Sequence, residues 1–272
     1  MAKWVFLNDG FTAEEKASLH FRDLSFQRGY GIFDFFRLVG NEPLFLEDHL
    51  DRFYFSAKEM HLEVPFHRLE LKKIIVELIG KNDLPDIGIR LSLTGGHSED
   101  GFNLGKPNLV ISQHAFSSPT DEQRHKGIKL TSYPHQRQLP HIKSIDYLMA
   151  IWLQPLRIKR GADDILYHHN GIISECPRSN FFLVTKDNKI VTPSVNALQG
   201  ITRKKLIDLA KAYYQIEERD IVLDEIKSAK EVFITSTTKQ ILPVKQMDEV
   251  VFDSTAFGNH LLELFRGTYS AE

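Results

Sequence analysis

A polar break near the middle of the chain is the feature that most constrains its fold. Residues 117–126 read Ser-Ser-Pro-Thr-Asp-Glu-Gln-Arg-His-Lys, and the hydrophobic periodicity seen on either side disappears there. Such a composition is typical of a loop between compact parts of a chain. The sequence therefore predicts a smaller N-terminal domain over residues 1–116, a linker over residues 117–126, and a larger domain over residues 127–272.

Strand and helix patterns are mixed on both sides of this break. Before it, the spacing of apolar residues predicts helices over residues 47–60 and 68–79, and strands over residues 30–39, 44–46, 87–94 and 108–114. After it, the pattern predicts helices over residues 144–160, kinked at Pro155, and 202–214. Asn170-Gly171 is the preferred pair for a type I′ hairpin turn, here between residues 165–169 and 172–174. Two such mixed groups indicate the α+β class.

Composition excludes several kinds of protein. The 272 residues are 42% apolar and 26% charged, which is typical of globular chains. Because 34 basic residues oppose 36 acidic ones without a basic stripe, no nucleic-acid partner is expected. No apolar run approaches the ~20 residues that span a bilayer, and the N-terminus turns polar too quickly for a signal peptide, so no membrane association is expected. A single cysteine, Cys176, fits a reducing compartment, and the expected location is the cytoplasm.

Lys143 is the first candidate for chemistry, in the segment His-Ile-Lys-Ser-Ile-Asp-Tyr over residues 141–147. A lysine amine attacks an aldehyde only when it is neutral, which requires shielding from water or a nearby cation. An apolar run follows to residue 153, so the pattern predicts that Lys143 lies at the start of a mostly buried helix. The alternative is an exposed lysine at a helix N-terminus.

Glu175 is the second candidate. It closes a predicted strand soon after the Asn170-Gly171 turn, next to the apolar pair Ile172 and Ile173. A carboxylate in such a place can keep a heterocyclic ring nitrogen protonated. The alternative is an ordinary glutamate at the end of a strand.

Two donor-rich segments suit an anion such as phosphate. Ile201 and Thr202 follow Gly200 at the start of a predicted helix, where free backbone N–H groups and the helix dipole favour negative charge. Thr237 and Thr238 end the segment Thr-Ser-Thr-Thr over residues 235–238, after the predicted strand over residues 232–234. The alternatives are a simple threonine cap and a polar strand end.

Arg52 lies in Asp-His-Leu-Asp-Arg-Phe over residues 48–53, and taken alone it would lie on a solvated helix face. Each of these signals is weak alone. Their order along the chain, Arg52, Lys143, Glu175, Thr202 and Thr237, resembles that of the class IV aminotransferases. This family of fold-type IV enzymes includes branched-chain and D-amino-acid aminotransferases and aminodeoxychorismate lyase, and the resemblance extends over about residues 23–244.

The resemblance implies a two-domain α+β fold, with a smaller N-terminal α/β domain and a larger β-rich domain that binds pyridoxal 5′-phosphate. It implies that Lys143 bonds to the cofactor, that Glu175 contacts the pyridine nitrogen, and that a tyrosine, here Tyr147, lies near the phenolic oxygen. The phosphate ligands would be Arg52, Ile201, Thr202 and Thr237. The family also implies a homodimer, and no metal site is predicted.

Departures from the family concern the substrate. Residues 23–34 keep the family spacing, but Tyr30 and Asp34 replace two acidic residues of its usual pattern. The loop over residues 95–101 lacks the arginine of D-amino-acid aminotransferases. A guanidinium at Arg178, three residues after Glu175, is unusual in the family and has no assigned role. The candidate substrate contacts are Arg90, Phe33, Thr238, His97 and Arg28.

Three functions are compatible with these residues. The leading hypothesis is amino-group transfer between an amino acid, branched-chain or similar, and a 2-oxo acid. The second keeps the cofactor but releases pyruvate from aminodeoxychorismate to form 4-aminobenzoate for folate synthesis. The third is a non-catalytic relative that binds a small ligand, which the altered residues 23–34 suggest and the presence of Lys143 and Glu175 opposes.

Overall fold

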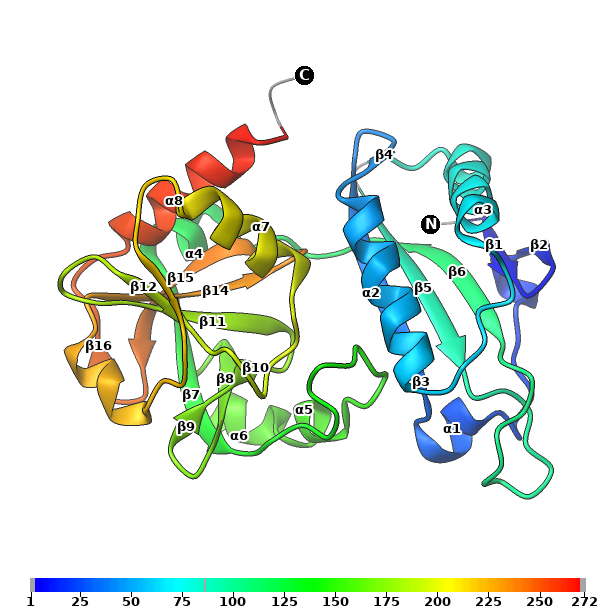
Figure 1. Cartoon of the computed structure of the whole chain (residues 1–272), viewed down its shortest axis with the longest axis horizontal. Coiled ribbons are helices and arrows are strands. Elements are labelled where there is room, and N and C mark those ends of the chain that lie inside the picture. Colours follow the sequence, from blue (N-terminus) through cyan, green and yellow to red (C-terminus); the bar gives the residue numbers. More distant parts are fainter. Residues whose placement is uncertain (1–2, 86, 270–272) are drawn as a thin grey trace. The chain divides into compact units, whose positions relative to one another are not determined.

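The computed structural model describes residues 3–85 and 87–269. The described part of the chain forms two compact units (Figure 1). The first unit comprises the described residues up to Ser117 together with Ile142–Asp146, and the second comprises Ser118–His141 and the described residues from Tyr147 onward. The segment that carries Lys143 therefore groups with the first unit, although it follows the start of the second in sequence.

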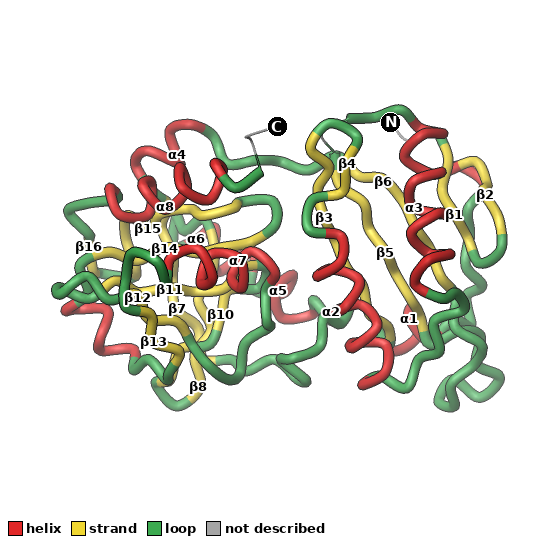
Figure 2. The backbone as a smooth tube through the Cα atoms, turned by 45° about the horizontal axis from the view of Figure 1, so that its top comes forward, coloured by secondary structure: helices red, strands yellow, loops and turns green. Residues whose placement is uncertain are grey.

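The first unit is an antiparallel sheet in the order β2-β1-β6-β5-β3-β4, with helices α2 and α3 packed on one face (Figures 1 and 2). Its strands are β1 (Trp4–Leu7), β2 (Gly10–Ala13), β3 (Gly31–Val39), β4 (Glu42–Pro43), β5 (Gly88–Thr94) and β6 (Leu109–His114). Its helices are η1 (Glu14–Lys16), α1 (Leu24–Arg28), α2 (Leu46–Glu59) and α3 (Arg68–Asn82).

Strand alternation explains how this unit is layered. Ile32, Phe36 and Leu38 of β3 join the core beneath the two helices, whereas Phe33 belongs to the opposite face of the sheet. Leu50 and Phe53 of α2 lie one turn apart and complete that core, as their helical spacing predicted. The helix predicted over residues 47–60 is thus confirmed as α2, and that over residues 68–79 as α3. The strand predicted over residues 44–46 is wrong, because α2 already begins at Leu46.

The second unit is built on a larger mixed sheet in the order β13-β12-β11-β14-β15-β7-β8-β9, with β10 paired to β11 and β16 paired to β15. Its strands are β7 (Ile128–Pro134), β8 (Asp164–His169), β9 (Ile172–Ile173), β10 (Glu175–Cys176), β11 (Ser179–Val184), β12 (Ile190–Thr192), β13 (Ile216–Glu218), β14 (Glu231–Ser236), β15 (Gln240–Met247) and β16 (Val250–Val251). Its helices are α4 (Asp121–Lys126), α5 (Leu148–Trp152), α6 (Gln154–Lys159), α7 (Ile201–Ala210), η2 (Leu223–Ser228) and α8 (Ala256–Gly267).

A buried core and two helices pack against this sheet. Alternate residues of β11 and β14, such as Phe181 and Ile234, enter a buried core on one face. Helices α7 and α8 pack against strands β14 and β15 (Figure 2). The carboxylate of Glu231 on β14 accepts hydrogen bonds from the backbone N–H groups of Phe257 and Gly258, and so caps the start of α8. A charged cap of this kind fixes that helix to the sheet.

Residues 117–126, predicted as a linker between domains, contain the short helix α4, and Thr120 and Gln123 form a capping box at its start. One helix prediction for this unit needs correction. The helix predicted over residues 144–160 is two short helices, and Pro155 lies in the first turn of α6, where the missing N–H of proline is tolerated. The Asn170-Gly171 hairpin is confirmed, with positive φ at both residues as a type I′ turn requires.

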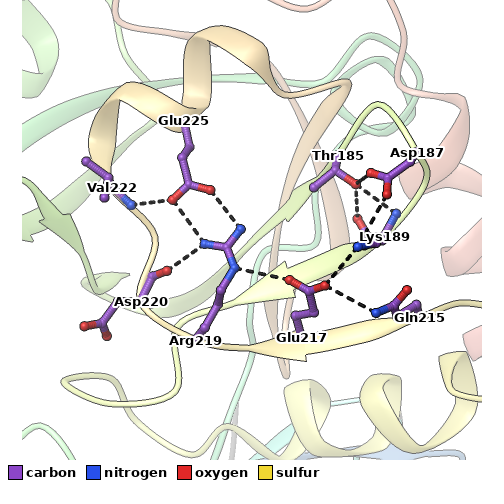
Figure 3. Close-up of polar contacts among 9 residues, drawn as sticks. All are labelled: Thr185, Asp187, Lys189, Gln215, Glu217, Arg219, Asp220, Val222 and Glu225. Atoms are coloured by element: carbon purple, nitrogen blue, oxygen red, sulfur yellow. Dashed lines mark hydrogen bonds and ion pairs between the residues drawn. The ribbon is translucent and has the colours of Figure 1, made fainter.

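An ionic network ties the surface elements β13 and η2 together (Figure 3). The Arg219 guanidinium donates to both carboxylate oxygens of Glu225, at 3.1 and 2.8 Å. Its Nε also donates to Glu217, which in turn pairs with Lys189 at 3.3 Å. Arg219 is 39% exposed, so this network contributes modestly to stability. Every helix in the described part of the chain is too short or too polar to span a lipid bilayer.

Candidate active site

The backbone around Lys143 pairs with β3. Lys143 O accepts a hydrogen bond from Phe33 N, and Ile145 N donates to Gly31 O, both at 3.0 Å. This pairing holds the segment in an extended conformation, so no helix can start at residue 144. The prediction that Lys143 begins a mostly buried helix is therefore wrong: α5 starts later, and its first residue, Leu148, is 72% exposed.

Two cations lie against one aromatic ring in the first unit. The Lys143 ammonium is 4.4 Å from the ring centroid of Phe33, and the Arg90 guanidinium carbon is 4.0 Å from the same centroid. Cations are attracted to the negative face of an aromatic ring, and Phe33 is buried, which strengthens the attraction. Arg90 Nε also donates to Ser92 Oγ at 3.1 Å. Three residues predicted separately from sequence are thus brought together here.

A buried carboxylate fixes Arg52. Asp34 on β3 is fully buried and accepts hydrogen bonds from Arg52 Nε and Nη2, both at 2.8 Å, while His49 Nδ1 lies 2.7 Å away. Burial opposes ionisation of Asp34, but the charge of Arg52 and the hydrogen bonds from Arg52 and His49 outweigh it and hold its pKa well below the usual range. Burial lowers the pKa of His49 itself, so His49 is better described as a neutral donor than as an ionic partner. The bidentate pair sets the orientation of the Arg52 guanidinium.

In the second unit, Glu175 is a buried carboxylate held from two sides. Its Oε1 accepts from Arg137 Nε at 2.7 Å, and its Oε2 accepts from the backbone N–H of Leu198 at 3.0 Å. Arg137 is itself anchored, because its Nη2 donates to Pro140 O at 2.7 Å. The charge of Arg137 and the two hydrogen bonds compensate the burial of Glu175 and fix the direction of its carboxylate.

The start of α7 lies next to the strand that follows Glu175. Asn180 of β11 donates to Leu198 O at 2.7 Å, just before the helix begins. Gly200 is the N-cap residue and supplies no capping side chain, and a Cβ built on it would be 2.0 Å from Asn180 Oδ1. Ile201 and Thr202 open the helix and are both buried. The N-terminus of α7 is therefore packed closely against β11, without a side chain of its own to cap it.

A buried hydroxyl lies on the neighbouring strand. Thr235 of β14 is paired directly with Asn180, so their side chains share one face of the sheet. Within the described residues Thr235 Oγ1 is buried without a hydrogen-bond partner. Buried hydroxyls normally have a partner. An uncapped helix start beside an unsatisfied donor suits a phosphate group, so the residues present fit the phosphate of pyridoxal phosphate.

The remaining predicted residues are distributed over both units. Thr237 and Thr238 form the turn after β14. Tyr147 is the N-cap residue of α5. Arg28 donates to the neighbouring Gln27 O, and His97 pairs with Glu99 in an exposed loop, so the contacts of both lie outside the cluster around Phe33.

Arg178 occupies the two-residue turn between β10 and β11 and is exposed.

Sequence reasoning missed two residues that the structure places in direct contact with candidate site groups. Arg137 precedes Lys143 by six positions but pairs with Glu175, and no motif connects residues 38 positions apart. His49 lies in the segment quoted for Arg52, one turn before it, and the i, i+3 spacing was the available signal.

Comparison with known proteins assigns the family. The family model for amino-transferase class IV matches residues 31–247, and the chain belongs to this family of pyridoxal-phosphate-dependent enzymes. It is 29% identical over 261 residues to the D-alanine aminotransferase of Bacillus licheniformis, covering 93% of this chain and 92% of the relative. It is also 29% identical over 263 residues to a putative branched-chain-amino-acid aminotransferase of Methanocaldococcus jannaschii, covering 93% and 91%.

Solved structures establish the fold as that of fold-type IV enzymes. The branched-chain amino acid aminotransferase from Escherichia coli superimposes with a TM-score of 0.89 at 23% identity, covering 99% of this chain and 95% of that one. A putative 4-amino-4-deoxychorismate lyase from Legionella pneumophila superimposes with a TM-score of 0.85 at 26% identity, covering 93% and 96%.

Proposed function

We propose that this protein is an aminotransferase that uses pyridoxal phosphate to move an amino group between an amino acid and a 2-oxo acid. Its class IV relatives include D-alanine and branched-chain aminotransferases. The observation that carries the proposal is the pair of cations on Phe33, Lys143 at 4.4 Å and Arg90 at 4.0 Å. A nucleophilic amine beside a guanidinium suits a substrate that bears both an amino group and a carboxylate.

The cofactor, when bound, supplies an electron sink for the electrons of the substrate Cα–H bond. Lys143 Nζ would bond to its aldehyde and, once displaced by substrate, would carry the proton removed from Cα. Glu175 would keep the pyridine nitrogen protonated, and Arg137 would hold Glu175 in place. The remaining cofactor contacts in this proposal are Arg52, Ile201, Thr202, Thr237 and Tyr147.

Substrate contacts follow from the same arrangement. Arg90 would bind a substrate carboxylate, because its guanidinium carbon lies 4.0 Å from the Phe33 ring centroid and its Nε donates to Ser92 Oγ. Phe33 would form an apolar wall beside the reacting carbon, and Thr238 would offer a hydroxyl to the substrate. Arg28 and His97 complete the proposed set, although Arg28 donates to Gln27 O within α1 and His97 pairs with Glu99, both outside the cluster around Phe33.

Covalent labelling tests the role of Lys143. Borohydride reduction of the holoenzyme, followed by peptide mapping, should place the cofactor label on Lys143. Substituting Lys143→Ala should lower amino-transfer turnover by about 10²–10⁴-fold or more, the range typical of a lost acid–base group. A label on another lysine, or none in a protein saturated with pyridoxal phosphate, would rule out this assignment.

A second candidate function is supported by the Legionella neighbour, which is described as a putative 4-amino-4-deoxychorismate lyase and is 26% identical. In that reaction the same amine and cofactor would release pyruvate and leave 4-aminobenzoate. An amino-donor and keto-acceptor screen should therefore be run beside a pyruvate-release assay on enzymatically prepared aminodeoxychorismate. Amino transfer without pyruvate release favours the first function, and pyruvate release without amino transfer favours the second.

We also propose that the protein is a homodimer. Helix α5 carries three strongly exposed apolar side chains, Leu148 at 72%, Ile151 at 69% and Trp152 at 63%. Apolar side chains clustered on so short a helix are typical of an interface, and a second copy is the occupant that the family favours. Sedimentation velocity over a range of concentrations tests this assembly.

The buried free thiol of Cys176 suits the cytoplasm, the location we propose.

A further inference from the structure

The turn between β14 and β15 is held more firmly than a surface turn requires. Its residues Thr237 and Thr238 are followed by Lys239, whose backbone N–H donates to Ser236 Oγ at 3.2 Å. The next residue, Gln240, has a φ of 61°, in the left-handed region that non-glycine residues rarely adopt. A strained backbone persists only where its surroundings determine it.

Several contacts account for this strained conformation. Gln240 Oε1 accepts from Arg266 Nε of α8 at 3.1 Å, and its amide also contacts the Tyr269 hydroxyl. Arg124 Nη1 of α4 lies 3.4 Å from Lys239 O, the carbonyl just before Gln240. The end of the turn that leads into β15 is therefore fixed to two helices that pack against this strand.

The side chain of Lys239 forms a third support, inside the unit. Its Nζ is 3.1 Å from Asp164 Oδ2 on β8 and 2.9 Å from Ser179 Oγ on β11. The two charged side chains are only 16% and 10% exposed. Burying an ion pair costs much of the Coulombic attraction that it gains, so a pair at this depth is weak evidence for a role in stability alone.

The position of Ser179 gives this contact a geometric consequence. Ser179 pairs with Cys176 across the β10–β11 turn, and Glu175 pairs with Asn180 next to it. Asn180 in turn pairs with Thr235 of β14 and hydrogen-bonds Leu198 O, before α7. Lys239 therefore joins the Thr237–Thr238 turn to the same hairpin that holds Glu175 and the start of α7.

We propose that Lys239 is a positioning residue, whose ammonium fixes the Thr237–Thr238 turn against Asp164 and Ser179 so that this turn and the start of α7 can hold one phosphate group. This inference rests on the proposed use of pyridoxal phosphate, and it goes further by assigning a task to a residue that would not touch the cofactor. Fixing the turn in advance removes an ordering cost that binding would otherwise pay.

The test compares two ligands that differ only in phosphate. Binding of pyridoxal phosphate and of pyridoxal is measured by absorbance titration of the apoenzyme, for the wild type, Lys239→Met and Lys245→Met. Lys245 is the matched control, because it lies on the same strand β15 and its ammonium donates to Phe252 O instead. The readout is the dissociation constant of pyridoxal divided by that of pyridoxal phosphate, a ratio that isolates the contribution of the phosphate.

We expect Lys239→Met to weaken pyridoxal phosphate binding by about tenfold or more. An effect of this size is typical when a residue that orients the binding residues, without touching the ligand itself, is lost. Pyridoxal binding should change little, and Lys245→Met should keep the wild-type ratio. An unchanged ratio in Lys239→Met would overturn the proposal, since loss of a purely structural lysine weakens the binding of both ligands together. An equal fall of the ratio in Lys239→Met and Lys245→Met would also overturn it.

Two further measurements keep the test decisive. Should Lys239→Met fail to fold, Asp164→Asn removes the same ion pair with almost no change in shape, and it should lower the ratio in the same direction. Protection of each apoprotein against heat by inorganic phosphate gives an independent readout that involves no bond to Lys143. Failure of the wild type to bind pyridoxal phosphate would refute the proposed function itself, whereas a normal wild type with an unaltered Lys239→Met ratio refutes only the role of Lys239.

Discussion

Replacing Asp34 by Asn should destabilise the first unit severely. Asn keeps the shape of the side chain, but it places an amide donor against Arg52, whose side chain is only 9% exposed. The wild-type carboxylate accepts two hydrogen bonds from Arg52, both at 2.8 Å. Removing one partner of a buried ion pair costs about 3–5 kcal/mol, because the other charge is left uncompensated. That is a large part of the ~5–15 kcal/mol that stabilises a typical domain.

The two tryptophans allow the effect to be located. Trp4 lies on β1 of the first unit and Trp152 on α5 of the second. Urea unfolding followed by fluorescence in a Trp152→Phe background therefore reports the first unit, and the Trp4→Phe background reports the second. Asp34→Asn should lower the unfolding midpoint seen by Trp4 much more than that seen by Trp152.

The control is Glu99→Gln, which breaks the ion pair between Arg22 and Glu99, whose side chains are 44% and 82% exposed. Solvated pairs of this kind contribute little to stability. If Asp34→Asn were no more harmful than Glu99→Gln when monitored by Trp4, the reasoning from burial would be refuted.

The pH dependence of the same pair has a definite sign. The pKa of Asp34 is lowered from its ordinary value of 3.8, so the folded state binds this proton less readily than the unfolded state. The stability contributed by the carboxylate is fully present above that ordinary value and is lost as pH falls toward the lower folded-state pKa. The difference in unfolding free energy between wild type and Asp34→Asn should therefore shrink as pH falls below about 4.

Four other substitutions test separate parts of the structure. Glu231→Gln removes the charge that caps α8 and should cost about 1–3 kcal/mol, measured by thermal unfolding followed by circular dichroism. Arg219→Met breaks the network of Figure 3 and should cost less than about 1 kcal/mol in low salt and still less in high salt. Gly200→Ala places a Cβ 2.0 Å from Asn180 Oδ1 and should weaken pyridoxal phosphate binding in the absorbance titration; unchanged affinity would refute the close approach. Glu175→Gln should still bind the cofactor but turn over roughly tenfold more slowly or worse, about 1.4 kcal/mol of barrier or more, in a steady-state transamination assay.

The sequence correctly predicted elements whose conformation depends on residues close together in the chain. The Asn170-Gly171 hairpin forms because both residues tolerate positive φ, and α2 forms because Leu50 and Phe53 share one helical face. The order of Lys143 and Glu175 along the chain predicted the family, since that order reflects the path of the fold. These features were accessible because each is encoded within a few residues or in their sequence order.

The structure departed from prediction where distant segments meet. The apolar run after Lys143 has helical spacing, but hydrogen bonds to Gly31 and Phe33 hold the preceding segment extended. The ion pairs of Arg137 with Glu175 and of Lys239 with Asp164 join residues 38 and 75 positions apart. No periodicity in the sequence records such pairings, because the partners meet only after the sheets have formed.

The return of Ile142–Asp146 to the first unit has a consequence for biosynthesis. A ribosome releases the chain from its N-terminus, and domains that are continuous in sequence can fold as soon as they emerge. Here the edge of β3 stays open until Lys143 and its neighbours have been translated, with part of the second unit already made. A fragment ending at Ser117 would expose that edge to pairing with other chains and would lack Lys143. Completion of the first unit and placement of Lys143 beside Phe33 are therefore the same folding event.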